Sequence, residues 1–219
     1  MGKIKVKIQA FIFDLDGVLT DTAEHHFLSW KRLCEEEGIP FNREINEKLR
    51  GVSRKKSLEI ILGEKKVSAE KFAEMMARKN KYYQESIRNI SPADLFPGAE
   101  EILEELKKKG LKLALGSSSK NARTVIKGLG IEKYFDVIGD GNSVEKAKPA
   151  PDLFLFAAKR LGVSPGKCVV VEDAEAGIEA ALEAGMFVVG IGPPERVGKS
   201  HIFFPSVLEI QLEEINKMF

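Results

Sequence analysis

Short apolar segments that end at polar residues recur along the chain, and this pattern predicts buried strands. Four of them are typical of the centre of a parallel sheet, because each is predominantly apolar and short: Ile8–Phe13, Leu111–Leu115, Cys168–Val171 and Phe187–Ile191. Two shorter segments predict weaker strands: Asp136–Ile138 and Ile202–Phe204.

Amphipathic helical patterns separate the later strands. They cover Ala99–Lys109, Asp152–Leu161 and Glu175–Ala184, and each is followed at once by a glycine, the residue that most often ends a helix. Because strand and helix alternate from about Ala93 onward, this part of the chain is predicted to form βαβ units on a parallel sheet.

The stretch from about Leu19 to Ser91 shows no strand pattern and predicts helices throughout. Two apolar series recur there at helical spacing: Ala23, Phe27, Trp30 and Cys34, and, after a candidate N-cap at Ser68, Phe72, Met75, Met76 and Tyr83. A helical insert after the first strand predicts a cap over the carboxyl edge of the sheet, where open α/β folds bind ligands. We therefore expect an α/β fold: a Rossmann-like parallel-sheet core of residues 1–18 and 92–219, with an inserted all-helical cap domain of residues 19–91.

Composition excludes several classes of protein. With 219 residues, 43% hydrophobic and 31% charged, the chain is typical of a globular protein with a buried core. Lys plus Arg number 34 against 33 for Asp plus Glu, so the net charge of +1 gives no case for a nucleic-acid or membrane-surface partner. No apolar run reaches the roughly 18 residues of a membrane span. We expect neither nucleic acid nor membrane as a partner.

The two cysteines, Cys34 and Cys168, form no disulfide framework and no metal-ligand spacing, which favours a reducing cytosol. The N-terminal segment MGKIKVKIQAFIFD leads into two aspartates instead of a cleavage site, so no signal peptide is expected. We predict a cytoplasmic monomer.

The most informative segment is FDLDGVLTDT, in which Asp14 ends the first predicted strand and Asp16 follows just before Gly17. Two carboxylates this close repel each other, so a cation or a charged ligand usually offsets them. One carboxylate can attack phosphorus while the other delivers and removes the proton, provided that their environments differ. Taken alone, the segment fits a solvated acidic turn equally well.

Three further segments follow predicted strands. GSSSKN, residues 116–121, opens a helix, so its hydroxyls, N–H groups and lysine can cradle a phosphate, although a plain serine N-cap would look the same. AKPAPD places Lys148 before a rigid Pro-x-Pro turn, where it could also be merely solvated. VEDAEAG contains Glu172 and Asp173, whose carboxylate oxygens are hard ligands that could bind Mg²⁺ together with Asp14. Alternatively, the two acidic residues simply stabilise the N-terminus of a helix.

In this order, the four segments resemble the four motifs of the haloacid dehalogenase superfamily of phosphotransferases. The resemblance covers the whole chain and implies a Rossmann-like core, a Mg²⁺ cofactor and an aspartyl-phosphate intermediate. It implies that Asp14 is the nucleophile and that Asp16 is the general acid/base. The metal ligands implied are Asp14, Asp16 (through its backbone carbonyl), Glu172 and Asp173, while Ser117 and Lys148 would hold the transferring phosphoryl group.

Four segments of the helical insert, TDTAEHHFLSW, LRGVSRKKSL, ARKNKYY and SPAD, are similar to the β-phosphoglucomutase family within this superfamily. This resemblance implies interconversion of β-D-glucose 1-phosphate and glucose 6-phosphate through glucose 1,6-bisphosphate, with a phosphosugar as the small-molecule partner and Arg54 as the clamp of the non-transferring phosphate. The substrate-binding residues implied are His26, Trp30, Gly51, Val52, Ser53, Arg54, Ser57, Lys79, Ser117, Ser118, Ser119, Lys120, Asn121 and Lys148.

The chemistry of three cap residues agrees with these roles, and each also has a simpler explanation. His26 and Trp30 are four residues apart, hence on one helix face, where a histidine can also be a packed core residue. Lys79 falls on the apolar stripe and needs a charged partner or a route to water. The fork of Arg54 suits bidentate phosphate binding, although Arg54 can also belong to a solvated basic turn.

Two rival functions share this fold. A sugar-phosphate phosphatase would use the same Asp14 and Asp16 but admit water after the first transfer; only the cap residues favour the mutase. A non-catalytic phosphosugar sensor would have lost catalytic groups, and no carboxylate of the motifs is missing here.

Overall fold

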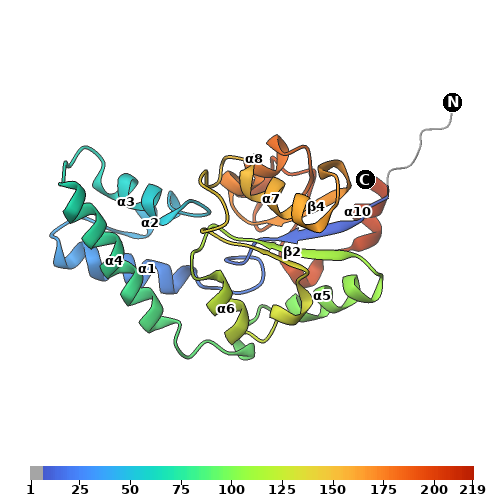
Figure 1. Cartoon of the computed structure of the whole chain (residues 1–219), viewed down its shortest axis with the longest axis horizontal. Coiled ribbons are helices and arrows are strands. Elements are labelled where there is room, and N and C mark those ends of the chain that lie inside the picture. Colours follow the sequence, from blue (N-terminus) through green and yellow to red (C-terminus); the bar gives the residue numbers. More distant parts are fainter. Residues whose placement is uncertain (1–6) are drawn as a thin grey trace.

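The computed structural model describes residues 7–219, and the core is an α/β fold around one six-stranded sheet (Figure 1). All neighbouring strands are parallel, in the order β3-β2-β1-β4-β5-β6. The strands are β1 (Ala10–Phe13), β2 (Lys112–Gly116), β3 (Val137–Gly139), β4 (Cys168–Glu172), β5 (Phe187–Ile191) and β6 (Ile202–Phe204). Every predicted strand is present, with ends shifted by up to two residues. The expectation about a signal peptide rests partly on Met1–Val6, which lie outside the described residues.

The register of the central strands brings the sequence motifs to one edge of the sheet. Phe13 of β1 is paired with Leu115 of β2 and with Val171 of β4. The residues that follow these three strands therefore meet at the carboxyl edge. The connection from β1 leads to β2 on one side, and the connection from β3 crosses to β4 on the other side of β1. This edge is therefore also the topological switch point at which such sheets bind ligands.

Helices cover both faces of the sheet (Figure 1). One face packs on α7 (Asp152–Leu161) and α8 (Glu175–Glu183) through Ile12 and Val170. The other packs on α5 (Ala99–Lys108), α6 (Ala122–Gly128) and α10 (Leu212–Met218) through Phe11. Strand side chains alternate between the two faces, so the continuously apolar strands fill two cores at once. Short helical segments complete the core: η1 (Pro92–Asp94), η2 (Glu132–Tyr134), η3 (Pro165–Lys167), α9 (Pro194–Val197) and η4 (Val207–Glu209).

The segment between β1 and α5 forms a separate helical cap at one end of the sheet (Figure 1). Its helices are α1 (Ala23–Glu36), α2 (Arg43–Glu47), α3 (Arg54–Leu62) and α4 (Ala69–Ser86). They enclose their own apolar cluster, in which Trp30, Leu58 and Met75 are buried. Ser68 accepts a hydrogen bond from the Lys71 N–H, as predicted for the N-cap of α4.

The predicted fold class is confirmed by the parallel sheet and the inserted helices. The domain boundaries after residues 18 and 91 remain a prediction. None of the helices within residues 7–219 is long and apolar enough to cross a membrane.

Candidate active site

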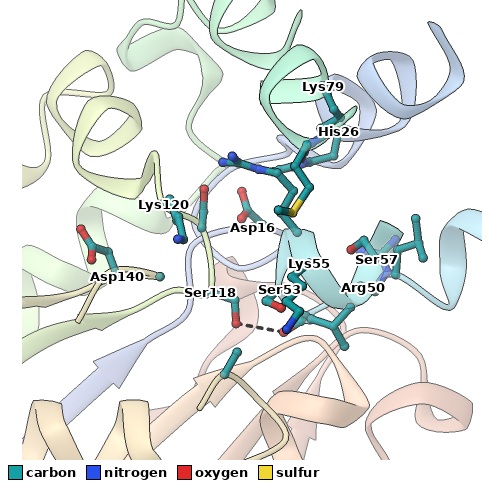
Figure 2. A pocket seen from close by; sticks show the side chains of 18 of the residues that line it. Asp16, His26, Arg50, Ser53, Lys55, Ser57, Lys79, Ser118, Lys120 and Asp140 are labelled. Atoms are coloured by element: carbon teal, nitrogen blue, oxygen red, sulfur yellow. Dashed lines mark hydrogen bonds between the residues drawn. The ribbon is translucent and has the colours of Figure 1, made fainter. Parts of the chain in front are cut away.

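A cavity of about 760 Å³ lies between the cap and the carboxyl edge of the sheet. Both parts of the chain contribute to its lining, and Figure 2 shows Asp16, Ser118 and Lys120 of the core opposite His26 and Lys79 of the cap. Thirteen of the predicted site residues line it: Asp14, Asp16, His26, Trp30, Gly51, Val52, Ser53, Arg54, Ser57, Lys79, Ser118, Ser119 and Lys120.

The remaining predicted residues are buried next to this lining. They are Ser117, Asn121, Lys148, Glu172 and Asp173. Ser117 follows β2, and its hydroxyl accepts a hydrogen bond from the Ser119 N–H at 3.1 Å, which fixes the turn at the start of α6. The structure thus gathers residues that are far apart in the sequence, while their roles stay predictions.

Asp14 is the first residue after β1, and its carboxylate has a buried cationic partner. The Lys148 ammonium donates hydrogen bonds to Asp14 Oδ1 at 2.7 Å and to Glu172 Oε1 at 2.6 Å. Burial raises the pKa of Asp14 to about 6, although Lys148 opposes this shift. Burial acts to lower the pKa of Lys148, but its two carboxylate partners raise it above its usual range, so Lys148 stays charged.

Three carboxylates meet around this point. Oxygen atoms of Asp14, Glu172 and Asp173 lie within 4.8 Å of one another, and all three residues are buried. Burial, followed by the negative charges of Glu172 and Asp14, raises the pKa of Asp173 well above its ordinary value. A hard, oxygen-ligated cation fits this donor set.

Asp16 lies in a different environment from Asp14. Its N–H donates to Asp14 Oδ2 at 3.1 Å, while its carboxylate accepts a hydrogen bond from the Thr22 hydroxyl. Gly17, with φ of +87°, lets the chain turn directly after Asp16, and a side chain there would overlap the carboxylate of Asp173. Burial, followed by the charge of Asp14, raises the pKa of Asp16 to about 7. The two aspartates therefore differ in their partners, as separate catalytic roles require.

His26 and Lys79 form a pair between α1 and α4. Lys79 Nζ lies 2.7 Å from His26 Nδ1, within hydrogen-bonding distance. Lys79 is only 1% exposed, which excludes the simpler explanation that it reaches out to water. Burial, followed by the charge of Arg54, lowers the pKa of Lys79 well below its usual value, and burial and then Lys79 lower the pKa of His26.

Arg54 begins α3 directly after the N-cap Ser53, whose hydroxyl accepts from the Lys56 N–H. It lines the cavity, and burial lowers its pKa from the ordinary value. Within residues 7–219 it forms no ion pair, in contrast to the arginines on the outer surface of the cap. A half-buried guanidinium that faces a cavity without a carboxylate partner is suited to an anionic ligand.

Two contacts join the cap loop to the core. The Ser118 hydroxyl donates to the Gly51 carbonyl at 3.0 Å (Figure 2), and Arg50 Nη1 donates to Asp173 Oδ2 at 3.0 Å. Gly51 has φ of +75°, and a Cβ added there would lie 2.8 Å from the Cβ of Ala174, so the close approach requires glycine. Arg50 was missed in the sequence because it precedes the GVSR segment and no local pattern indicates its partner.

Asn121 makes a third contact between the two parts. Its side chain donates to Asn80 Oδ1 at 2.9 Å and accepts from Gln84 Nε2 at 3.2 Å, both on α4. The residue predicted to bind substrate is therefore placed at the junction of α4 and α6, beside the cavity.

Comparison with known proteins shows the family of the chain. Residues 11–191 match the family of haloacid dehalogenase-like hydrolases, and the chain belongs to this family. It is 44% identical over 214 residues to the beta-phosphoglucomutase of Bacillus subtilis (strain 168), with 96% of this chain and 95% of that protein covered. The phosphorylated carbohydrates phosphatase of Thermotoga maritima is 35% identical over 214 residues, with 95% and 96% covered.

A solved structure gives the same result. The crystal structure of beta-phosphoglucomutase from Clostridium difficile matches with a TM-score of 0.92 and 41% identity, covering 96% of each chain. The predicted superfamily and the resemblance to β-phosphoglucomutases are therefore confirmed.

Proposed function

We propose that this protein is an enzyme that interconverts β-D-glucose 1-phosphate and glucose 6-phosphate through β-glucose 1,6-bisphosphate. One observation carries the proposal: a single cavity has Asp14 and Asp16 on its core side and, on its cap side, Arg54, which forms no ion pair within residues 7–219. A sugar with two phosphates can then place one at each end. The 44% identity to a beta-phosphoglucomutase over nearly the whole chain supports the same reaction.

Asp14 is the proposed nucleophile. Phosphorylated Asp14 donates its phosphoryl group to one sugar hydroxyl oxygen, while Asp16 accepts the proton of that hydroxyl. After the bisphosphate turns round, Asp14 attacks the other phosphate, the bond from phosphorus to the sugar oxygen breaks, and Asp16 returns the proton to that oxygen. Lys148, 2.7 Å from Asp14 Oδ1, and the backbone N–H groups near Ser117 stabilise the charge on the phosphoryl oxygens.

Mg²⁺ is the cation we propose for the acidic cluster. Asp14, Glu172 and Asp173 would hold it with the Asp16 carbonyl, because these are the hard oxygen ligands that Mg²⁺ prefers. When bound, it supplies positive charge that neutralises phosphoryl oxygens. Lys148, 2.7 Å from Asp14, and Arg50, 3.0 Å from Asp173, already offset part of the negative charge.

Cap residues orient the sugar in this proposal. Arg54 binds the distal phosphate, which is the phosphate that is not being transferred, from the cap. Ser118, Lys120 and Asn121 bind the same phosphate from the core. His26 and Lys79 contact the sugar hydroxyls from the cap side of the cavity, beside Trp30. The cap also keeps water away from phospho-Asp14, which a mutase needs and a phosphatase does not.

³¹P NMR of the purified protein with Mg²⁺, β-glucose 1-phosphate and a trace of glucose 1,6-bisphosphate tests the function. We expect the signal to move from the C1 phosphate to the C6 phosphate with little inorganic phosphate. Accumulation of inorganic phosphate would instead favour the phosphatase, the activity for which the 35% identical Thermotoga relative is named.

Replacing Arg54 by alanine is expected to lower kcat/KM for β-glucose 1-phosphate by about 10²-fold, because two charge-assisted hydrogen bonds to the distal phosphate are lost. Phosphorylation of Asp14 by a small donor such as acetyl phosphate, which has no distal phosphate, should change less than about threefold. Arg54→Lys should recover only part of the loss. Lys56→Ala, an exposed neighbour that pairs with Glu59, is the matched control. An equal loss with both donors would contradict the role of a distal clamp.

Binding of Mg²⁺ should stabilise the fold, since the ion binds the folded protein only. At one hundred times its Kd, the free energy of unfolding should rise by about 2.7 kcal/mol. Thermal unfolding with and without Mg²⁺ measures this, and Asp173→Asn should remove most of the gain. Glu175→Gln, outside the cluster and paired with Lys199, should leave it intact. The same gain in both variants would place the ion elsewhere.

A phosphosugar is thus the proposed partner. The cytosolic location and the monomeric state remain predictions, the first resting on two free, buried cysteines.

A further inference from the structure

Arg50 is a cap residue whose charge reaches the acidic cluster of the core. It lies in the turn between α2 and α3 and lines the cavity (Figure 2). Its Nη1 atom donates to Asp173 Oδ2 at 3.0 Å, and the side chain of Asp173 is only 2% exposed. Asp173 is also one of the three carboxylates proposed to hold Mg²⁺. A cation carried by the cap therefore contacts a carboxylate that the metal also needs.

Glu47 fixes the direction in which the guanidinium of Arg50 points. Its carboxylate oxygens accept from Nε at 3.2 Å and from Nη2 at 3.1 Å, which leaves Nη1 to donate to Asp173. Glu47 is the last residue of α2, so the guanidinium is held by a helix of the cap. The contact between Arg50 and Asp173 therefore exists only while the cap lies against the core.

A second arginine near Asp173 comes from the core. Arg196 Nε donates to the backbone carbonyl of Asp173 at 2.8 Å, and Arg196 Nη2 lies 4.0 Å from Asp173 Oδ2. Arg196 belongs to α9, which packs on α8, so both partners of this contact are core residues. Of the two arginines, Arg50 is thus the one whose contact with the carboxylate is made or broken when the cap moves.

We propose that Arg50 couples the position of the cap to the metal site, because its guanidinium and a divalent cation compete for the charge of Asp173. The inference rests on the proposed metal site of Asp14, Glu172 and Asp173. Two cations that share one buried carboxylate repel each other strongly, since little water screens them. Metal binding should weaken the contact between cap and core, and by reciprocity closing of the cap should weaken metal binding.

The substrate offsets this repulsion in the proposed reaction. A phosphoryl group at Asp14 brings negative charge next to the acidic cluster, so that Arg50 and the metal are held at the same time. Arg54, four residues after Arg50, binds the distal phosphate from the same side of the cavity. The cap is then loosened by the metal alone and closes when the phosphosugar is bound.

The alternative is that Arg50 is only a structural ion pair that holds the cap on the core, in which case its loss leaves metal affinity unchanged. Arg50→Gln separates the two explanations, because it removes the charge and keeps a polar side chain. In calorimetric titration with Mg²⁺ at fixed pH and without substrate, Arg50→Gln should lower the Kd about tenfold. Arg50→Lys, which keeps the charge, should stay within about threefold of the wild type.

Lys55→Gln is the matched control, because it removes one positive charge from the same cavity. Lys55 is exposed on α3 and lines the cavity, but within residues 7–219 it forms no ion pair with Asp173. Its substitution should change the Kd for Mg²⁺ by less than about twofold, since an exposed charge is screened by salt. Thermal unfolding checks that each variant is folded.

Small-angle X-ray scattering tests the effect on the cap. The radius of gyration of the wild type should rise when Mg²⁺ is added, and glucose 6-phosphate added with Mg²⁺ should reverse the rise. In Arg50→Gln, Mg²⁺ alone should leave the radius of gyration unchanged, because the contact that it weakens is already absent.

An equal or higher Kd for Mg²⁺ in Arg50→Gln, or a wild-type radius that Mg²⁺ does not change, would overturn the proposal. A rise that glucose 6-phosphate fails to reverse, although ³¹P NMR shows mutase turnover, would overturn it as well. Mg²⁺ binding that survives in Asp173→Asn would instead refute the metal site. Release of phosphate alone in ³¹P NMR would refute the mutase, and the titration without substrate would still decide the role of Arg50.

Discussion

Asp14→Asn should reduce mutase turnover by at least about 10⁴-fold, the order of loss seen when a catalytic nucleophile is removed. An amide oxygen is too weak a nucleophile to attack phosphorus, and the amide cannot form the acyl phosphate. The substitution is nearly isosteric, and Lys148 keeps its hydrogen bond to Glu172 at 2.6 Å. The variant should therefore fold, and the loss should appear in kcat.

Two measurements check this expectation. ³¹P NMR should show no conversion of β-glucose 1-phosphate, and intact mass after incubation with a phosphoryl donor should show a phosphorylated wild type but an unmodified variant. Asp21→Asn, an exposed aspartate of the same segment that caps the Ala23 N–H, is the control and should stay within about twofold of the wild type. A phosphorylated Asp14→Asn protein would exclude Asp14 as the acceptor.

The core could be predicted from the sequence because its signals are local. Apolar strand segments such as 168–171 and 187–191 are buried on both faces, and glycines such as Gly162 and Gly185 follow the helices that precede them. In a parallel sheet the carboxyl ends share one edge, so the motifs that follow the strands are gathered by the topology itself. The strand ends were less predictable: Gln9 still exchanges backbone hydrogen bonds with Lys112 and Lys167 although β1 begins at Ala10, whereas the Leu111 N–H donates to Leu106 in α5 and not to the sheet.

The proposed catalytic groups of the core could be placed at this edge for the same reason, whereas the contacts between cap and core could not be predicted. Arg50 reaches Asp173 across 123 positions of sequence, and Ser118 reaches the Gly51 carbonyl across 67. Neither contact has a periodic or local signature. The position of Lys79 on the apolar stripe of its helix could be predicted from the sequence. Its partner His26 could not, because that contact depends on how α1 packs on α4.

The same buried charges determine both the stability of the folded core and the proposed chemistry of the site. Asp14, Glu172 and Asp173 bring three buried carboxylates together, and Lys148 is the cation in contact with two of them. A second cation, Arg50, reaches Asp173 from the cap. The core itself supplies Lys148 and also Arg196, which lies 4.0 Å from Asp173 Oδ2, whereas the contribution of Arg50 depends on the cap lying against the core.

Lys148→Met should accordingly be the most destabilising single change among the predicted site residues. The side chain of Lys148 is fully buried and pairs with Asp14 and Glu172 at 2.7 and 2.6 Å. Methionine fills a similar volume but leaves the two carboxylates buried without their counter-charge. Breaking a buried ion pair in this way costs about 3–5 kcal/mol, so urea denaturation should show the free energy of unfolding reduced by this amount.

Turnover of Lys148→Met should also fall, by about 10²- to 10³-fold, because the cation that stabilises the transferring phosphoryl group is lost. Lys146→Met, two positions earlier and exposed, should change neither quantity. If the unfolding free energy of Lys148→Met equalled that of Lys146→Met, the carboxylates would have to be neutral in the folded protein. A loss of stability together with a loss of turnover would instead show that one buried ammonium both keeps the carboxylates charged in the folded core and serves the reaction.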